Sequence, residues 1–531
     1  MACSSSEGFW RLGLLAAILL RDGEELMLAV VDGTGLMALG FALPLTYRLF
    51  FLLIEPLATL AGAYYAFFDQ QIYLNLTHAA SAPSPVPLGT SIAMSQLANL
   101  YFAFALSEAL ILRSTSDLGV WKAVLFCLLV ADFGHLYTVR VLGPGIYWSV
   151  SDWNAIDWGN IGYVYFAASM RIAFLAGFTG FQVDGPETWL DFHKNEFQPK
   201  PFGDYDVDIK IECCGVCASD VHTISGGWGK QHYPLAVGHE IVGTAVRVGP
   251  KVTLIQEGQR VGVGAQSYSC LDCRQCKNDN ETYCRKQLDT YGAVWPDTGI
   301  VSQGGYSSHV RTHEHWVFPI PEALPSTVAA PMLCAGLTAY SPLVRNGCGP
   351  GKKVAIVGLG GIGHMGVMFA KALGAEVWVI SRTHAKEEDA RKLGADGFLA
   401  TADAGWNEPH VMTFDLIVNT ASSFDGFDLD AYLSLLDVHA KWVSVGLPED
   451  DGIKVRNQTF LNNGCFFGSS HLGSRKEVLA MLQLAADKGI RTWVEEMPIS
   501  KENLATALTR VHKNDIRYRF CLTDYQDQFG A

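Results

Sequence analysis

The sequence predicts an α-helical four-span membrane bundle followed by a soluble α/β part, one half of which is rich in β-strands and the other a doubly wound parallel sheet. Three observations point to this architecture. Four long apolar runs lie before residue 180. Beyond it, short apolar blocks alternate with charged and glycine-rich turns, as in soluble α/β proteins. A G-x-G-x-x-G motif at Gly358 follows a short β-branched run and begins an amphipathic helix.

Length and composition restrict the number of domains, the class of partner and the cellular compartment. At 531 residues the chain is too long for one core. Its formal net charge of −14 leaves no basic stripe to displace counterions from phosphates, which argues against a nucleic-acid partner. Four of the 13 Cys are regularly spaced, which favours metal ligands over a disulfide framework. Because thiolate ligands persist best in a reducing compartment, we expect the second half of the chain in the cytosol.

The first 40 residues stay unassigned. Residues 9–20 are apolar but short, contain Arg11 and lack the cleavage site of a signal peptide. The four runs of the length of a membrane-spanning helix follow, at 44–68, 91–112, 120–142 and 160–178.

Basic residues indicate how these runs are oriented. Arg48 lies near the start of the first run, and Arg113 and Lys122 flank the connection between the second and third. The connection 69–90 has no Lys or Arg. The positive-inside rule therefore places the amino terminus and everything after residue 178 in the cytosol. A sequon at Asn75 falls in the predicted lumenal loop, although two more sequons occur in the predicted cytosolic part.

Five ionisable residues lie within or beside these runs, where a charge is costly unless it faces a partner or a polar cavity. One interpretation is a small polar pocket for a lipid or sterol-like ligand. The other is that these residues pair with one another to fix helix packing, or lie at the interface. They are Glu55, Glu108, Asp132, His135 and Arg171.

The helical part resembles a known family. PLTYRLFFLLIEPLATLAGAYYAFF and VADFGHLYTVRVLG are similar to an uncharacterised family of four-helix fungal membrane proteins. The resemblance covers residues 40–176 and implies a location but no activity.

The stretch from Cys213 to Glu240 contains candidate metal ligands. Cys217 supplies a thiolate and His239 an imidazole, a pair that suits Zn²⁺ better than Mg²⁺. Asp220 can fix the ligand imidazole, and Ser219 and His222 are groups suited to carrying a proton outward. The alternative is that these are buried structural residues.

A second metal site is predicted from C-x2-C-x2-C-x7-C. Four thiolates this close in sequence complete a tetrahedral set and leave no position for substrate, so we interpret the loop as a structural zinc site. Free surface thiols or an iron centre are the alternatives. The ligands are Cys270, Cys273, Cys276 and Cys284.

The glycine motif predicts a Rossmann cofactor site. Its residues are Gly358, Gly360, Gly361 and Gly363, and they would place a pyrophosphate at a helix amino terminus. The next strand, 376–380, is followed by no acid for a ribose 2′-hydroxyl. It is followed instead by Ser381, Arg382 and Lys386, which suit a 2′-phosphate, so we expect NADP. The alternative is that both cations are solvated surface charges.

The second half of the chain as a whole resembles the zinc-dependent medium-chain alcohol dehydrogenases. GVCASDVH, GHEIVG, the four-Cys loop and GLGGIGH occur in that family's order, and KPFGDYDVDIKIECCGVC is especially similar to its NADP-dependent, cinnamyl-alcohol-dehydrogenase-type branch. The resemblance implies a GroES-like catalytic domain and Cys217, His239 and Cys334 as catalytic zinc ligands. It also implies that Glu240 is a nearby carboxylate able to enter the coordination sphere, and that Cys213 and Cys214 are packing residues.

The resemblance also bears on substrate and cofactor contacts. Plant enzymes for cinnamyl alcohols have an aromatic residue where this chain has Asp289, which weakens the case for lignin precursors. Trp228, Tyr291 and Trp295 are candidates for an apolar pocket wall, or for packing residues. The segment 468–474 resembles the family's contact region for nicotinamide.

These arguments divide the chain into five parts. They are an unassigned segment 1–40, a four-helix transmembrane domain 41–178, a GroES-like zinc catalytic domain 179–334, a Rossmann NADP-binding domain 335–485, and a return to the catalytic domain over 486–531.

The predicted function is hydride transfer between NADP(H) and a primary alcohol or aldehyde at a zinc ion, with two zinc ions per chain and the homodimer of the family as an option. One alternative is a membrane lipid-binding or interaction module that carries the dehydrogenase as a passenger. Another is the merger of two neighbouring reading frames near residue 178.

Overall fold

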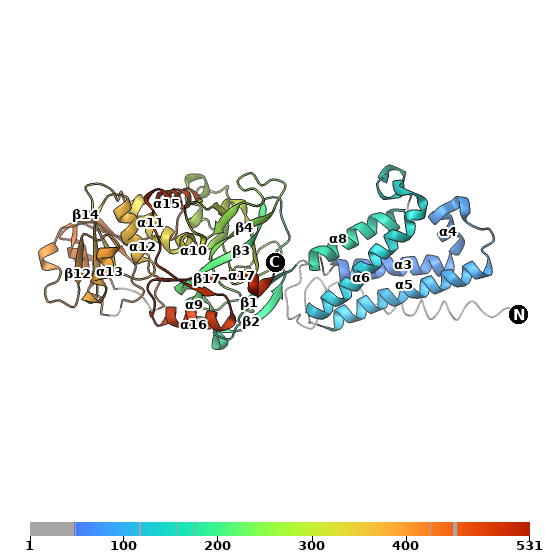
Figure 1. The fold of residues 1–531 in the computed structure, drawn as a ribbon, viewed down its shortest axis with the longest axis horizontal. Helices are drawn as coiled ribbons and strands as arrows, with labels where there is room; N and C mark the ends of the chain where they lie inside the picture. Colours follow the sequence, from blue (N-terminus) through green and yellow to red (C-terminus); the bar gives the residue numbers. More distant parts are fainter. Residues whose placement is uncertain are drawn as a thin grey trace. The chain divides into compact units, whose positions relative to one another are not determined.

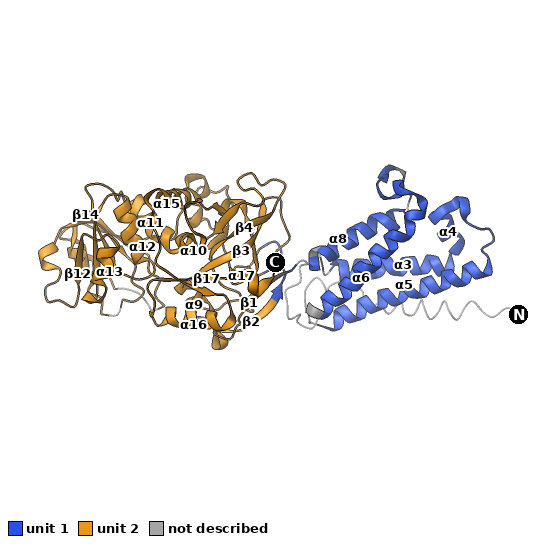
Figure 2. Cartoon of the chain, in the orientation of Figure 1, with its two compact units in different colours: residues 1–177, 196–198, 296–300 blue, residues 178–195, 199–295, 301–531 orange. Residues whose placement is uncertain are grey.

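The computed structural model describes residues 47–530 apart from 48, 116–117, 155–156, 176, 425 and 450–453, so the unassigned segment 1–40 lies outside the described residues. The chain forms two compact units (Figure 2). The first comprises residues up to 177 with 196–198 and 296–300, and the second comprises the rest.

The first unit consists of apolar helices (Figure 1). Its interior includes Phe51, Trp121 and Phe174, all fully buried. Its outer surface is apolar too, since Leu110 and Phe126 are more than half exposed, and such a surface suits contact with lipid. The helices are α3 (Glu55–Phe68), α4 (Gln70–His78), α5 (Leu88–Ser114), α6 (Leu118–Thr138) and α8 (Tyr163–Leu175).

Three helices of this unit are long and apolar enough to cross a bilayer: Phe50–Phe68, Leu88–Ser114 and Val120–Leu142. They correspond to the first three predicted runs. The fourth run, 160–178, differs from the prediction because it contains the 13-residue α8 behind a five-residue π-helix and ends in a strand. A bent pair, Ser326–Leu333 with Ala335–Arg345, also meets the length and hydropathy criteria among the described residues. That pair belongs to the buried core of the second unit, which explains its hydropathy without a membrane.

The ionisable residues of the helices partly pair with one another. The buried Arg171 of α8 forms ion pairs with Glu55 of α3 and Asp132 of α6. The pairing hypothesis is therefore confirmed for these three residues. Glu108 of α5 is also buried. Its Oε1 atom has no hydrogen-bond partner among the described residues.

The second unit contains a mostly antiparallel sheet in the order β16-β17-β3-β4-β5-β9, with β8 paired to β3. Along its longest strand, β3, buried and exposed side chains do not alternate, because both faces of the strand are buried. The last two strands, β16 and β17, come from the end of the chain, within the segment that the sequence analysis assigned to a return to the catalytic domain. The strands are β3 (Asp206–Val216), β4 (Glu240–Val248), β5 (Arg260–Val263), β8 (His309–His313), β9 (Phe318–Pro319), β16 (Val494–Pro498) and β17 (Arg519–Thr523).

A six-stranded parallel sheet follows, in the order β12-β11-β10-β13-β14-β15. Its central strands are continuous apolar runs, because helices such as α12 (Gly363–Ala372) cover a parallel sheet on its faces. The glycine motif lies at the carboxyl end of β10, where ligands of such sheets bind. The strands are β10 (Lys353–Val357), β11 (Glu376–Ser381), β12 (Gly397–Ala400), β13 (Phe414–Asn419), β14 (Leu436–Ser444) and β15 (Phe466–Ser469).

Candidate active site

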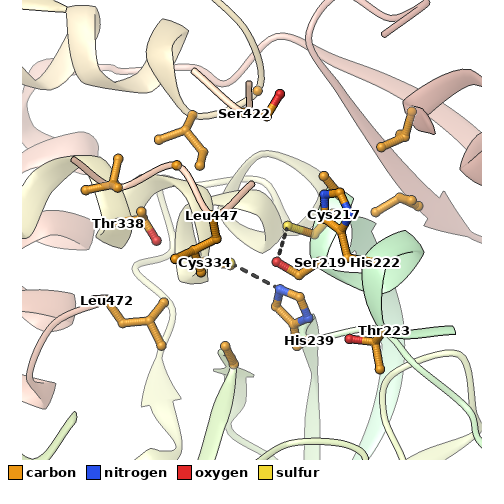
Figure 3. Close-up of a pocket in the computed structure, with 18 of the residues that line it drawn as sticks. Cys217, Ser219, His222, Thr223, His239, Cys334, Thr338, Ser422, Leu447 and Leu472 are labelled. Carbon is orange, nitrogen blue, oxygen red and sulfur yellow. Dashed lines mark hydrogen bonds between the residues drawn. The ribbon is translucent and has the colours of Figure 1, made fainter. Parts of the chain in front are cut away.

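Three candidate metal ligands meet at one cavity (Figure 3). Cys217 lies between β3 and α9 (Ala218–Ile224), His239 directly precedes β4, and Cys334 directly precedes α11 (Ala335–Arg345). The His239 Nε2 atom is 3.1 Å from Cys334 Sγ. With a carboxylate oxygen of Glu240, the ligand atoms of these residues all lie within 4.8 Å of one another. The structure thus brings together the catalytic ligand set expected from the sequence.

A glycine is required beside the imidazole. Gly238 has φ of +100°, and a Cβ atom there would lie 2.7 Å from the ring of Tyr306. Only glycine adopts this backbone geometry freely while leaving room for the ring. The sequence GHE therefore fixes the direction in which His239 leaves the chain.

Asp220 organises the residues around the ligands. Its carboxylate is fully buried and accepts hydrogen bonds from the Cys217 backbone N–H at 2.9 Å and from the Tyr306 hydroxyl at 2.8 Å. Its Oδ1 atom lies 3.1 Å from His239 Nδ1. A carboxylate on Nδ1 leaves Nε2 facing the metal position and increases the basicity of the ligand.

The charges at this site depend on one another. A hydrogen bond from Cys334 holds the pKa of the Cys217 thiol well below its usual range, while the pKa of Cys334 is raised well above it. Burial raises the pKa of Glu240 to about 8, although Arg519 pairs with its Oε1 atom. Its Oε2 atom is buried and has no partner among the described residues.

This donor set fits zinc. Two sulfur atoms and one imidazole nitrogen are ligands that zinc prefers, and three protein ligands leave a fourth position for substrate. The unpartnered oxygen of Glu240 lies within the same group of atoms. The site therefore has one more potential donor than a catalytic zinc needs.

The four-Cys loop forms the second ligand group. Sulfur pairs from Cys270, Cys273, Cys276 and Cys284 are 3.5 to 3.9 Å apart. A tetrahedron with zinc–sulfur bonds of about 2.3 Å has edges of roughly 3.8 Å, so the spacing matches a zinc ion held by four sulfurs. The loop also contacts the cofactor half, since the Thr282 hydroxyl donates to the carbonyl of His471 at 3.3 Å.

The glycine motif forms a cradle with room above it. Gly358 has φ of +85°, and a Cβ atom at Gly363 would lie 1.9 Å from the carbonyl oxygen of Gly358. No atom of the described residues lies within 4 Å of a Cβ built at Gly360, and one built at Gly361 would meet the Arg519 guanidinium. Gly358 and Gly363 thus allow a tight turn, and the open space at Gly360 leaves room for a pyrophosphate. This arrangement fits a dinucleotide.

The residues expected to hold a 2′-phosphate lie beyond β11. Ser381 ends that strand, and Arg382 is exposed. Lys386 is half-buried and donates to the carbonyl of Leu359 at 2.7 Å. Burial lowers the pKa of Lys386, and the nearby Arg517 and Arg382 lower it further. Arg517 is a third cation that the sequence analysis missed, because it lies far along the chain and outside any local motif.

The cavity has a volume of about 400 Å³ and joins both sites. The cavity is lined by the three ligand residues, by Ser219 and His222, and by Gly360 and Gly361. Ser470 to Leu472, from the segment expected to contact nicotinamide, line it as well. The Ser219 hydroxyl lies 3.5 Å from Cys217 Sγ.

His222 has an unforeseen partner. Its Nδ1 atom bonds to Glu449, which follows β14 in the cofactor half. A Cβ atom at Gly227 would lie 1.9 Å from Glu449 Oε1, so glycine makes room for this carboxylate. Nothing local in the sequence marks Glu449, because the two residues are 227 positions apart.

The substrate wall is mixed in character. Trp228 and Tyr291 line the cavity, but Trp295 does not. For Trp295 the structure supports the alternative of a packing residue, because its ring packs on Tyr268 at 5.7 Å. Asp289 lies in the cavity wall and its side chain is open to solvent. Partial desolvation within the cleft raises the pKa of this acid, and His471 and His239 lower it in part.

Three families match parts of the chain. Residues 40–181 match a domain of unknown function, DUF7704. Residues 203–322 match the alcohol dehydrogenase GroES-like domain, and residues 361–487 match the zinc-binding dehydrogenase family.

Individual relatives agree with these matches. The NADP-dependent alcohol dehydrogenase 6 of Saccharomyces cerevisiae is 50% identical over 355 residues, which are 66% of this chain and 98% of that protein. A probable cinnamyl alcohol dehydrogenase 3 of Oryza sativa is 41% identical over 60% of this chain and 86% of that protein. A solved cinnamyl alcohol dehydrogenase from Sorghum bicolor has a TM-score of 0.62 at 35% identity, covering 65% of this chain and 97% of that one. The corresponding enzyme from Helicobacter pylori, complexed with NADP(H), has a TM-score of 0.60 at 30% identity, covering 65% and 98%.

Proposed function

Because the chain belongs to the zinc-type medium-chain alcohol dehydrogenases, we propose that it interconverts an aldehyde and a primary alcohol with NADP(H) at the site of Cys217, His239 and Cys334. One observation supports this above all others. The three ligand residues, two glycines of the motif and Ser470 to Leu472 line the same cavity, so a substrate at the ligand residues would face the nicotinamide of a cofactor whose pyrophosphate lies at the glycines. Aldehyde reduction is the expected net direction in a cytosol rich in NADPH.

The protein residues have separate tasks in this reaction. Cys217, His239 and Cys334 would hold zinc, which polarises an aldehyde carbonyl and acidifies an alcohol hydroxyl. Asp220 orients His239, and Glu240 remains beside the ligands with one unpartnered oxygen. The ligand shell therefore fixes where the substrate oxygen can lie.

Proton movement falls to residues at the cavity wall. We assign Ser219 as the group that exchanges a proton with the substrate oxygen and His222 as the next carrier. The hydrogen bond from His222 to Glu449 connects the carrier to a carboxylate that is 45% exposed. In this assignment a proton from solvent would pass from Glu449 to His222 and then to Ser219, and the last two residues both line the cavity.

The cofactor residues select NADPH over NADH. NADPH supplies the hydride. Gly358, Gly360, Gly361 and Gly363 would receive its pyrophosphate, with Ser381, Arg382, Lys386 and Arg517 around its 2′-phosphate. No acid stands at the end of β11 to compete for that position.

The first unit would hold the enzyme on a membrane, with the catalytic half in the cytosol. Three candidate spanning helices with exposed apolar residues support the attachment. Arg113 and Lys122 place the connection between the second and third of them in the cytosol. The catalytic half then lies in the cytosol if the π-helix and α8 (Trp158–Leu175) cross as a fourth span. The substrate would be an aliphatic or aromatic aldehyde. Asp289 at the cavity wall disfavours purely apolar cinnamyl compounds in comparison with aldehydes that bear a hydrogen-bond donor.

The test is an assay of the full-length chain in detergent. NADPH oxidation is followed against a panel of aliphatic, aromatic and hydroxylated aldehydes, and zinc is measured in the same preparation. We expect turnover with NADPH, at least tenfold less with NADH by order of magnitude, and about two zinc ions per chain. Turnover in protein that contains zinc only in the four-Cys loop would contradict the proposal.

A further inference from the structure

The first unit contains a buried group of charged side chains that the dehydrogenase reaction does not use. It is drawn from four helices, α3, α5, α6 and α8. Glu55, Glu108 and Arg171 are each at most 5% exposed. Groups of this kind are costly inside an apolar bundle and are retained where they pair or carry out a function.

The charges of this group do not balance. Arg171 is shared by Glu55 and Asp132, so one guanidinium faces two carboxylates. Arg113 interacts electrostatically with Glu108, but its hydrogen bonds go to the backbone carbonyls of Ala109 and Leu52. Three acids therefore share two guanidinium groups, and one negative charge is left over.

The excess acid is Glu108. Its Oε1 atom is buried and has no hydrogen-bond partner among the described residues. Four further buried polar atoms of this unit have no partner among the described residues: Glu55 Oε2, Arg171 Nε, the Tyr163 hydroxyl and His135 Nε2. Asp132 and Tyr163 are close enough to Glu108 to interact with it electrostatically. An unpartnered carboxylate in such a place lacks several kcal/mol of stabilisation, whereas a carboxylic acid is far easier to bury.

A metal ion does not fit this group. Ca²⁺ and Mg²⁺ require about six or more oxygen ligands. Among the described residues, clustered His, Cys and carboxylate ligands occur only at the catalytic site and the four-Cys loop. The smallest species that removes one negative charge and occupies one oxygen is a proton.

We propose that Glu108 is a proton-binding site of the helical unit, held as a carboxylic acid beside the Arg171 ion pairs. Its bound proton exchanges with solvent through the neighbouring polar atoms of Asp132, Tyr163 and His135. The site does not depend on the dehydrogenase reaction. Acids that bind a proton within membrane helices are characteristic of proteins that relay protons or couple proton transfer to transport.

A lipid-soluble carbodiimide tests the proposal. Dicyclohexylcarbodiimide adds to a protonated carboxyl group in an apolar environment, and the adduct rearranges to a stable N-acylurea that mass spectrometry locates. The full chain is reconstituted in phosphatidylcholine vesicles and treated at neutral pH. We expect modification at Glu108 and at least about tenfold less at Glu55, because an opposite charge in hydrogen-bond contact lowers the protonated fraction by that factor or more.

Glu55 is a matched control, since it is equally buried in the same group but paired with Arg171. Two variants sharpen the result. Glu108→Gln should abolish the modification while keeping the shape and neutrality of the acid. Arg171→Gln should make Glu55 reactive toward the carbodiimide. An unchanged size-exclusion profile shows that this variant is folded. If it does not fold, the comparison of Glu108 with Glu55 in the wild-type protein still tests the proposal.

Modification should decrease as pH is raised, because only the acid reacts. An unmodified Glu108, or equal modification of Glu55 and Glu108, overturns the proposal. Protection of Glu108 by Na⁺ or Li⁺ at constant pH also overturns it, in favour of a bound metal cation. None of these outcomes depends on aldehyde reduction.

Discussion

Replacing Cys217 distinguishes the role of the metal site from that of the cofactor site. Cys217→Ser should lower NADPH-dependent aldehyde reduction by at least about 100-fold, since even the partners of metal ligands contribute 10- to 100-fold. Zinc content should fall from about two ions per chain to one, while NADPH binding, followed by fluorescence, remains. Cys213→Ala is the control, because that thiol is buried in the core beside the site. Equal activity in both variants would exclude Cys217 as a ligand.

Arg382 tests the cofactor preference. Arg382→Glu removes a charge-assisted hydrogen bond worth about 1.5–3 kcal/mol, so the affinity for NADPH should fall about 10- to 100-fold and that for NADH should change little. The matched control is Lys392→Glu, an exposed cation of α13 (Glu387–Lys392) that pairs with Glu388. An unchanged ratio of the two affinities would refute the assignment.

Lys386 gives the same site a pH dependence. Burial lowers its pKa, and Arg517 and Arg382 act in the same direction. Only the protonated amine attracts the 2′-phosphate, so NADPH should bind progressively more weakly as pH rises from about 7 to about 10. Lys386→Arg should remove this trend, because a guanidinium stays charged. NADH titrations should show no comparable trend, and a wild-type NADPH affinity that stays flat over this range would rule out Lys386.

At the scale of single residues, the sequence identified groups that lie in short motifs. The ligand residues, the four thiols and the glycines were all expected, and the structure brings them together. Glu449 and Arg517 were missed because each acts on a residue more than a hundred positions away, through loops whose approach depends on the whole fold. For Trp295 the sequence left a pocket wall and a packing role open, and its contact with Tyr268 decides for packing.

Among the elements, the four-Cys loop joins stability to activity. Its Glu281 accepts a hydrogen bond from the Arg475 backbone at 2.7 Å, and Thr282 contacts the carbonyl of His471, which lines the cavity. Losing the zinc of this loop should therefore loosen a wall of the active site.

We expect Cys273→Ser to lose one zinc ion and to lower Tm by at least about 5 °C, given about 2–4 °C per kcal/mol for a domain of this size. The KM for the aldehyde should rise more than kcat falls, because the catalytic ligands are intact. Calorimetry and metal analysis provide the measurements, with Cys348→Ser as a control thiol outside both ligand groups. Unchanged Tm and metal content would show that the loop binds no zinc.

The elements were predictable where their pattern is local. Strands β10 and β11 and helix α12 follow the predicted order because a parallel sheet requires continuous apolar strands. The last apolar run was harder to interpret. Its composition matches a spanning helix, but a π-helical start shortens the regular helix and the strand β1 (Phe178–Gln182) takes its end.

For the whole molecule, the proposed membrane attachment of the helical unit can be tested directly. The full chain should remain in the pellet after an alkaline carbonate wash of membranes, because spanning helices resist extraction. Protease added to sealed microsomes should digest the catalytic half, as expected for a cytosolic orientation. Lumenal marker proteins control for vesicle integrity. Release of the chain by carbonate would indicate peripheral attachment, and protection from protease would reverse the orientation.

The return of the chain end to the first sheet has a genetic consequence. Strand β17 pairs with β3, and its Arg519 bonds Glu240 beside the metal ligands, while Arg517 just before it stands near the 2′-phosphate residues. A premature stop codon in the final stretch of the reading frame would thus be as damaging as one near its middle. Alleles truncated there should behave as complete loss of function for aldehyde reduction.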